Sequence, residues 1–320
     1  MTFPFPLFSK FSSLKITFYI ALLLIFVILI NNYFFLKKNN GLYEGFTQDK
    51  KFLLKQDNDI YDNFYIDIYD KLNDTEERTN YDVNKIITLT NIDKNTTYIL
   101  DVGCGTGVLV NQFLKKGILI KGIDKSQNMI DYANNKNPVF KNNNESSYQC
   151  MDIEDSNIFK QSTFSHILCL YMTIYEIQNK LKFFYNSYYS LKSDGFLIIH
   201  LIKTKNDYNG FINLGKPKAL NENDIYNSDI KKLQTNFGSF TYNKDWSDIY
   251  NLKESFTDNK TNFIRQNNLT WYYEPIDIIL QQIKSCGFSI YDIVPEYKNI
   301  GGYLYFFKKP GIFNYKNLIK

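Results

Sequence analysis

The sequence predicts an α/β protein built on a doubly wound, mainly parallel β-sheet, and three observations lead to this. Between residues 98 and 202, apolar runs of strand length alternate with stretches of helical periodicity. The apolar run Tyr98–Leu100 leads into a glycine-rich bend, D-V-G-C-G-T-G, and then into a helix. Asp124 follows about 20 residues after the first glycine, where a βαβ unit places an acid against ribose hydroxyls.

The first residues of the chain differ from this pattern. Residues 16–36 contain no charged residue and are long enough, at ~1.5 Å per residue, to cross a hydrocarbon core of ~30 Å. No small-residue cleavage site follows, so we expect a membrane anchor rather than a removed signal peptide, with a buried core helix as the alternative. A slight excess of lysine after the span predicts that the large domain faces the cytosol.

The predicted organisation has four parts. They are an N-terminal segment (residues 1–38) with a transmembrane helix at about 16–36, a linker (39–57), a folded domain (58–310) and a tail (311–320).

The composition narrows the choice of partners. Lys and Arg number 37 against 33 Asp and Glu, and the only arginines are Arg78 and Arg265. Because arginine is the favoured bidentate reader of phosphate and guanine, its scarcity argues against nucleic-acid binding. The four cysteines show no paired C-x-x-C spacing, so neither a metal site nor a disulfide framework is expected.

Two helices are predicted before the bend. Apolar residues recur at every fourth position from Ile60 to Leu72, with a stripe of tyrosines beside them, and a second helix covers about residues 79–89. After the bend, a helix to about residue 116 and one capped by Ser126 alternate with strands. The expected strands are 118–123, 148–151, 164–170 and 196–202, with a helix around 181–188 before the last of them.

Residues 203–270 break the alternation. A loop with glycine and proline precedes a short helix expected near Ile225–Leu233, and aromatic, alternating segments then predict antiparallel strands. The alternation resumes with a helix at Ile276–Ile283, which Pro275 begins and Gly287 ends. Two strands, 288–294 and 303–307, close the chain as an antiparallel pair.

The bend resembles motif I of the class I S-adenosylmethionine-dependent methyltransferases. Its spacing is G-x-G-x-G, with Val108 where the third glycine of a dinucleotide-binding G-x-G-x-x-G would stand. Asp101, before the bend, would repel a pyrophosphate and attract the ammonium group of S-adenosyl-L-methionine. The resemblance covers roughly residues 60–308. It implies a Rossmann-like, seven-stranded sheet with an antiparallel last strand and a β-rich insertion, 203–270, that covers the substrate pocket.

The resemblance also implies the cofactor site. Asp124 resembles the motif II acid, while Asp152 and Ile153 fall where the family meets the adenine. Tyr69, or failing that Tyr65, corresponds to a tyrosine that reaches over the methionine end. The cofactor-binding residues implied are Tyr69, Asp101, Gly103, Cys104, Gly105, Thr106, Gly107, Asp124, Lys125, Asp152, Ile153 and Leu170.

Methyl transfer needs an aligned nucleophile and the exclusion of water, so this fold requires no fixed catalytic residue. His200, at the end of the fifth strand, is a candidate base, and Tyr171 is a candidate for orienting the acceptor. His166 lies within a strand and is expected to be a core residue. Ser165 departs from the family pattern, because an aspartate usually stands there.

The sequence therefore predicts a membrane-anchored, S-adenosylmethionine-dependent methyltransferase whose acceptor stays open. A non-catalytic, cofactor-binding scaffold of the same fold is the alternative, and a nicotinamide-dependent oxidoreductase is the third candidate. The phrases FSHILCLYMTIYEI and GFLIIHLI most resemble methyltransferase-like proteins of large DNA viruses, which suggests a viral origin and a host-cell or virion membrane.

Overall fold

The structure is a computed structural model, and it describes the chain from residue 52 to residue 311 with six gaps. The described ranges are 52–73, 75–136, 147–156, 158–202, 230–245, 250–297 and 302–311, together with residues 23, 26, 27 and 30. The chain divides into two units, residues 1–50 and residues 51–320. Most of the predicted span at 16–36, residues 203–229 of the insertion and residues 312–320 of the tail lie outside the described residues. Within the described ranges, no helix is both long enough and apolar enough to cross a membrane.

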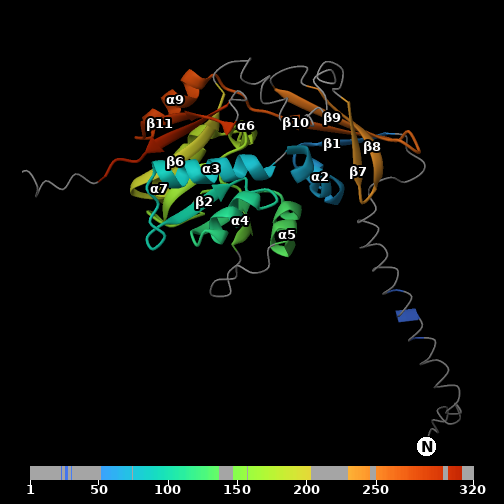
Figure 1. The fold of residues 1–320 in the computed structure, drawn as a ribbon, viewed down its shortest axis with the longest axis horizontal. Coiled ribbons are helices and arrows are strands. Elements are labelled where there is room, and N and C mark those ends of the chain that lie inside the picture. The colour runs from blue at the N-terminus through green and yellow to red at the C-terminus, as the bar shows by residue number, and fades with distance from the viewer. Residues whose placement is uncertain are drawn as a thin grey trace, which may run out of the picture. The chain divides into compact units, whose positions relative to one another are not determined.

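In the second unit, strands and helices alternate after an initial strand and two helices (Figure 1). The helices are η2 (Asp57–Ile60), α2 (Asn63–Asn73), α3 (Thr75–Leu89), α4 (Val108–Lys115), α5 (Gln127–Lys136), α6 (Thr173–Glu176), α7 (Lys180–Ser190) and α9 (Ile276–Ser285). The strands are β1 (Phe52–Gln56), β2 (Tyr98–Val102), β3 (Leu119–Asp124), β4 (Tyr148–Cys150), β5 (Phe164–Cys169), β6 (Leu191–Leu201), β7 (Ile230–Thr235), β8 (Gly238–Asp245), β9 (Asn251–Asp258), β10 (Ile264–Thr270), β11 (Ser289–Pro295) and β12 (Tyr303–Lys308).

The larger sheet has seven strands in the order β11-β12-β6-β5-β2-β3-β4. The strands from β6 to β4 pair in parallel, whereas β12 is antiparallel to both of its neighbours. The prediction of a seven-stranded sheet with an antiparallel last strand is therefore confirmed. The chain runs outward from β2 to β3 and β4 and then returns to the other side of β2 with β5, which makes the β2–β5 edge the switch point of the sheet.

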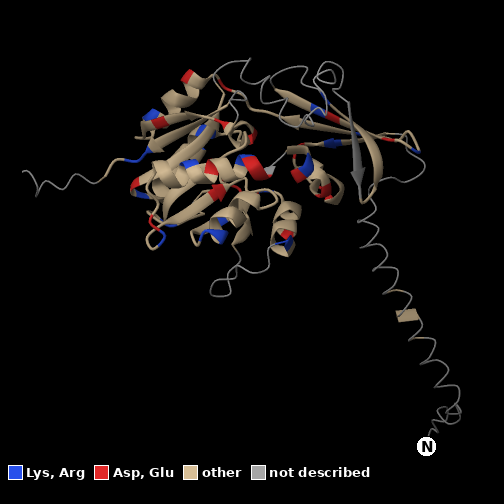
Figure 2. Ribbon diagram, in the orientation of Figure 1, with Lys and Arg blue, Asp and Glu red and all other residues tan. Residues whose placement is uncertain are grey.

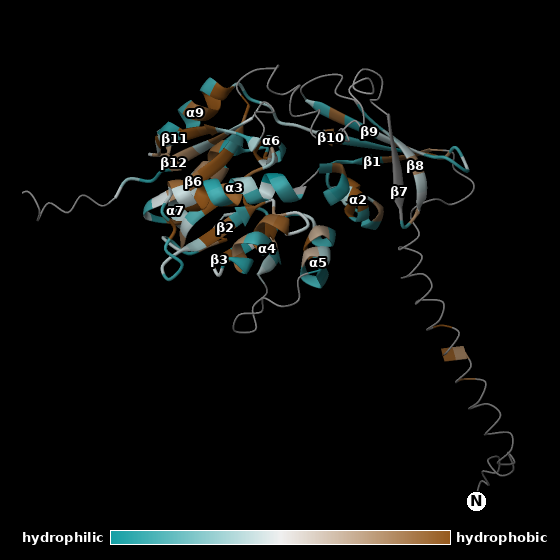
Figure 3. Ribbon diagram, in the orientation of Figure 1, coloured by the Kyte–Doolittle hydropathy of each residue, from teal (hydrophilic) through white to brown (hydrophobic). Residues whose placement is uncertain are grey.

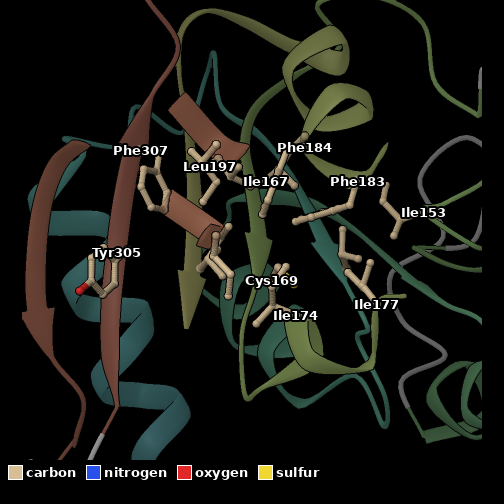
Figure 4. Close-up of a cluster of buried hydrophobic side chains, with 14 of the residues drawn as sticks. Ile153, Ile167, Cys169, Ile174, Ile177, Phe183, Phe184, Leu197, Tyr305 and Phe307 are labelled. Atoms are coloured by element: carbon tan, nitrogen blue, oxygen red, sulfur yellow. The ribbon is translucent and has the colours of Figure 1, made fainter. Parts of the chain in front are cut away.

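Alternate residues of each central strand face opposite layers of helices, because successive side chains of a strand point to opposite faces. Leu100, on one face, belongs to a cluster with Phe183 of α7 and Ile279 of α9. Figure 4 shows part of this cluster, with Phe183 and Phe184 near Ile167. Its neighbour Ile99 belongs to a second cluster with Phe113 of α4. Figure 3 shows the hydrophobic residues gathered on the strands and on the inward faces of the helices. Both faces of the sheet are thus covered, as a parallel sheet requires.

The second sheet has five strands in the order β1-β10-β9-β8-β7. Strands β7 to β10 form an antiparallel meander, and they account for the predicted β-rich insertion. Phe64 of α2 packs against Phe240 and Phe256, so the sheet closes over α2. Arg265 of β10, which is 1% exposed, makes a bidentate ion pair with Asp62 at 2.7 and 2.9 Å.

Two predictions about these segments are wrong. Residues 52–56 of the predicted linker form β1, which pairs in parallel with β10 more than 200 residues away in the chain. The helix expected near Ile225–Leu233 is a strand over its described part, because residues 230–235 pair with β8 as a hairpin. In both segments, pairing with a distant or following strand overrides the local pattern of the sequence.

Candidate functional site

The glycine-rich bend lies at the switch point, between the end of β2 and the start of α4. Gly103, Gly105 and Gly107 all have positive φ angles, of 73°, 51° and 81°, which side chains rarely allow. The amides of Gly103 and Cys104 both donate to the Ile123 carbonyl, at 2.8 and 3.0 Å. These bonds hold the bend against the end of β3 and bring it beside Asp124.

Asp124 is bonded on both of its carboxylate oxygens. One oxygen accepts from the Gly105 amide at 2.9 Å, and the other accepts from the Ser126 amide at 2.8 Å. Burial raises the pKa of Asp124, while these two backbone bonds act to lower it. The Gly105 amide, which a pyrophosphate would need, is therefore already occupied by a carboxylate of the protein itself.

A cavity opens at this edge of the sheet. Its wall combines the bend, the ends of β3 and β5, and tyrosines from the segment before β2. The lining residues are Tyr61, Tyr69, Val102, Gly103, Gly105, Ile123, Asp124, Lys125, Met129, Met151, Asp152, Ile153, Glu154, Tyr171, Thr173, Glu176 and Ile177.

The charges on the cavity wall favour a cationic ligand. The wall carries four carboxylates, at Asp124, Asp152, Glu154 and Glu176, and only one cation, at Lys125. Burial raises the pKa of Glu176 and nearby Asp124 raises it further, although Lys125 and the Tyr61 hydroxyl oppose this. A bound cation would relieve the cost of holding these half-buried carboxylates charged. Figure 2 shows acidic and basic residues interspersed along the elements of both sheets.

The tyrosines that line the cavity are held in place through α2. Thr106 of the bend donates from its hydroxyl to Asp70 of α2 at 2.6 Å, and this ties the helix to the bend. Tyr69 precedes Asp70 on the same helix, and the centre of its ring lies 6.5 Å from that of Tyr61. Tyr61 in turn donates to Glu176 at 3.1 Å. The bend and these aromatic side chains therefore form one connected wall.

The structure brings eight of the predicted site residues together on this wall: Tyr69, Gly103, Gly105, Asp124, Lys125, Asp152, Ile153 and Tyr171. Six others lie behind it: Asp101, Cys104, Thr106, Gly107, Leu170 and His200. These six are all buried.

Among the six, Asp101 is 3% exposed, and burial together with Asp124 raises its pKa well above the ordinary value. Cys104 packs toward Gly122, and Gly107 is covered by the Tyr148 ring. The second tyrosine candidate, Tyr65, is 6% exposed and its ring lies 6.2 Å from Phe256 of the five-stranded sheet. These buried residues pack beneath the residues that line the cavity.

Several lining residues were missed by the sequence prediction. Tyr61 belongs to the noted stripe of tyrosines, and Glu154 lies two residues after Asp152, so both had a signal in the sequence. Glu176 and Thr173 had none, because they belong to α6, a four-residue helix that follows the turn at Tyr171. The predicted core position of His166 agrees with its 4% exposure and its bonds to Ser165 and Thr90.

Tyr171 joins the cavity to a second group of buried polar residues, named here the polar cluster: Arg78, Asp82, Tyr171, His200 and Glu296. The Arg78 guanidinium lies over the Tyr171 ring, 4.1 Å from its centre. The Tyr171 amide donates to Nδ1 of His200 at 3.1 Å, and Nε2 of His200 lies 3.4 Å from Oε2 of Glu296. Burial lowers the pKa of His200 to about 3, with Arg78 acting in the same direction. His200 is therefore neutral, fully buried and in contact on both nitrogens, which suits it to position Tyr171.

Glu296 gives this region a measurable pH dependence. Burial raises its pKa from 4.5 to about 8, Asp82 raises it further, and Arg78 opposes both. The folded chain keeps a proton that the unfolded chain releases, so the free energy of unfolding should fall as the pH rises from about 4.5 to about 8. We expect Glu296→Gln to remove this contribution, at most about 1.4 kcal/mol per pH unit, in urea titrations across that range. An unchanged slope in Glu296→Gln would contradict the assignment.

Parts of this chain are similar in sequence to known proteins. Residues 99–195 match the family described as "Methyltransferase domain". A ubiquinone biosynthesis O-methyltransferase from Coxiella burnetii is 42% identical over 57 residues, which are 18% of this chain and 24% of that enzyme. The chain thus matches about a quarter of the length of that relative.

Solved structures resemble the fold over most of the chain. An S-adenosylmethionine-dependent methyltransferase from Clostridium acetobutylicum has a TM-score of 0.53 and 21% identity, covering 76% of this chain and 97% of its own. The CcbJ methyltransferase from Streptomyces caelestis has a TM-score of 0.57 and 11% identity, covering 80% and 100%. The described residues therefore have the Rossmann-like methyltransferase fold. Together with the domain match over residues 99–195, this agrees with the predicted cofactor, S-adenosyl-L-methionine.

Proposed function

We propose that the chain is an S-adenosylmethionine-dependent methyltransferase held at a membrane by residues 16–36. The observation that carries the enzymatic part is the acidic cavity around the glycine bend. S-adenosylmethionine supplies a methyl group on a sulfonium, and it carries an ammonium group but no phosphate. Its charges match the four carboxylates of the wall, and its lack of phosphate matches a Gly105 amide that Asp124 already occupies.

The residues fit the parts of this cofactor by their chemistry. We infer that Asp124 accepts the ribose hydroxyls, and that Asp152 with Ile153 provides an acceptor and an apolar surface for the adenine. Glu176, with Tyr61 and Tyr69, lies on the same wall and suits the charged methionine end. Tyr171 and Thr173 lie where the chain leaves β5 and would line the approach of the acceptor. A nicotinamide dinucleotide would instead place a pyrophosphate among carboxylates.

Cofactor binding tests this proposal directly. Calorimetry of the full chain should show binding of S-adenosylmethionine and of S-adenosylhomocysteine, and no binding of NAD. Transfer of tritium from methyl-labelled cofactor to an acceptor would distinguish an enzyme from a non-catalytic scaffold, which would bind the cofactor without turnover. Binding of NAD in place of S-adenosylmethionine would refute the assignment.

Asp124→Ala should weaken cofactor binding by about 1–3 kcal/mol, because the ribose hydroxyls would lose their acceptor. Asp124→Asn is the matched variant, since it keeps the shape of the side chain while removing its charge. Both are measured by calorimetry, with the free energy of unfolding checked separately because Asp124 also bonds Gly105 and Ser126. Unchanged cofactor affinity in a folded Asp124→Ala protein would contradict the role of Asp124 as the acceptor of the ribose hydroxyls.

The membrane part of the proposal is supported by the sequence of residues 16–36 and by the four described residues within it. Leu23, Phe26, Val27 and Ile30 are helical, apolar and 65%, 62%, 45% and 38% exposed. Exposed apolar side chains on a helix are costly in water and favourable in lipid. We expect the full chain to resist carbonate extraction from membranes, and a variant with Leu23, Phe26 and Val27 changed to lysine to be released. Protease accessibility from the cytosolic side would test the proposed orientation.

A further inference from the structure

The parts of the cofactor cavity follow the order of the strands in the sheet. Strands β4, β3, β2 and β5 are successive neighbours there. Asp152, the proposed acceptor from the adenine, follows β4, whereas Asp124, the proposed ribose acid, ends β3. In S-adenosylmethionine, the sulfonium is joined to the ribose through the carbon that lies away from the adenine. The sulfonium and the methionine end therefore belong on the β2 and β5 side of the cavity.

Glu176 supplies the negative charge on that side. The lining residues that follow β5 are Tyr171, Thr173, Glu176 and Ile177, and Glu176 is the acid among them. Glu176 belongs to α6, and this helix packs against the glycine bend, because a Cβ atom at Gly103 would lie 2.4 Å from Cγ2 of Thr173. The fold therefore holds this carboxylate on the part of the wall where the sulfonium belongs.

Glu176 also keeps bonding capacity that other acids of the wall have used. Both oxygens of Asp124 accept backbone amides, and both oxygens of Glu154 do the same, at 3.3 and 2.7 Å. Within the described part of the chain, the hydrogen bond that Glu176 accepts comes from the neutral Tyr61 hydroxyl, at 3.1 Å. A half-buried carboxylate with one neutral donor gains stability from a nearby cation.

We propose that Glu176 makes the cavity distinguish the methylated cofactor from its demethylated product by charge. This inference rests on the proposed methyltransferase function and concerns the regulation of the same site. In methyl transfer, a lone pair of the acceptor forms a bond to the methyl carbon while the carbon–sulfur bond breaks, and the electron pair of that bond stays on sulfur. The positive charge of the sulfur is thereby lost, whereas the adenosine and amino-acid groups are unchanged. Glu176 loses its counter-charge at that moment, which favours release of S-adenosylhomocysteine and binding of fresh cofactor.

The first test compares three ligands of the full chain by calorimetry: S-adenosylmethionine, S-adenosylhomocysteine and sinefungin, which carries a charged amine in place of the S-methyl group. Glu176→Gln should weaken binding of the two cationic ligands roughly tenfold and that of S-adenosylhomocysteine less than about threefold, because only the former lose a charge pair. Glutamine keeps the shape of the side chain and can still accept from Tyr61. Asp152→Asn is the matched control, since it removes an equal charge from the adenine side and should weaken all three ligands by the same factor.

The pH dependence of binding to the unmodified chain gives a second measurement, which does not depend on how a variant folds. Burial raises the pKa of Glu176, so the preference for the cationic cofactor should be lost as the pH falls through that raised pKa. The ammonium and carboxylate groups are common to S-adenosylmethionine and S-adenosylhomocysteine, so they cancel in the ratio of the two dissociation constants.

Other ionisable groups face Glu176, and one of them is a second acid with a raised pKa. The groups that interact with it are Asp57, Tyr61, Tyr69, Asp124 and Lys125. Burial raises the pKa of both tyrosines, which keeps them neutral, but it also raises the pKa of Asp124. Glu176→Gln separates the two acids, because it should flatten the pH dependence of the ratio while Asp124 remains.

The outcomes are distinct. A preference for the cationic ligands that falls both in Glu176→Gln and at low pH would support the proposal. The proposal is overturned if Glu176→Gln weakens the three ligands by the same factor, if Asp152→Asn lowers the preference as much, or if the ratio does not change with pH. Failure of both S-adenosylmethionine and S-adenosylhomocysteine to bind would instead refute the proposed function, so the two failures are distinguishable.

Discussion

Gly103→Ala is expected to destabilise the folded domain by about 2–5 kcal/mol and to abolish measurable cofactor binding. Gly103 has a φ of +73°, and a Cβ atom built there would lie 2.4 Å from Cγ2 and 2.8 Å from Oγ1 of Thr173. The backbone strain and the clash therefore add. Relief of the clash would push α6, which carries Thr173 and Glu176, away from the cavity.

Gly117→Ala separates these two effects. Gly117 has the same φ of +73°, but a Cβ atom there would meet nothing within 4 Å. Gly117→Ala should lower the free energy of unfolding only by the backbone strain, about 1–2 kcal/mol, and should leave cofactor affinity unchanged. Urea unfolding measures the stabilities, and calorimetry with S-adenosylmethionine measures the affinities. Equal losses in the two variants would show that Thr173 does not constrain the bend.

The bend can be tested at a second glycine, Gly105, by substitution with valine. A Cβ atom at Gly105 lies 3.8 Å from the Tyr69 ring, which is ordinary contact. Its φ of +51° still makes a branched side chain unfavourable. Gly105→Val should therefore still fail to bind, and normal binding would mean that the bend is not the site.

Arg265→Ala is expected to lower the free energy of unfolding by about 3 kcal/mol. The Arg265 guanidinium is 1% exposed, and it binds Asp62 twice, the Ile60 carbonyl at 3.0 Å and the Asn267 side chain at 2.9 Å. It also lies over the Phe64 ring, 4.8 Å from its centre. Its removal takes a donor from the Ile60 carbonyl and the Asn267 side chain, while Asp62 keeps, among the described residues, only the Tyr65 amide and the more distant Lys55.

Arg265→Lys is the matched variant, because it keeps the charge but cannot reproduce the separate bonds of Nε to Asn267 and of Nη2 to the Ile60 carbonyl. We expect an intermediate loss, read from urea unfolding monitored by the fluorescence of Trp271, which is buried beside Tyr175. A loss below about 1 kcal/mol for Arg265→Ala would place this pair among ordinary surface ion pairs.

The main sheet could be predicted from the sequence because its signals are local. Apolar strands such as Tyr98–Val102 and the glycine bend carry their own patterns, and the acid at Asp124 falls at a distance that the βαβ unit fixes. Half of the wall could be named for the same reason, since strand ends meet at one edge of a parallel sheet. The viral resemblance and the cytosolic orientation stay predictions.

The remaining parts depend on contacts between distant segments. Asp101 was expected to meet the cofactor, yet it lies behind the wall, because a residue within a strand can face either layer. The pairing of β1 with β10 and the meeting of Arg78, His200 and Glu296 have no local signal. The sequence around Glu296 contains no motif, and its contact with His200 is apparent only from its position after β11 in the fold.

The parallel pairing of β1 with β10 has a practical consequence for anyone truncating the chain. The domain boundary that the sequence suggests, at residue 58, would remove all five residues of β1 and leave one edge of β10 without a partner. An open edge of this kind invites self-association and aggregation. A shortened protein should therefore begin before Phe52, and poor solubility of a version starting at residue 58 would reflect the missing edge strand rather than a fault in the cofactor site.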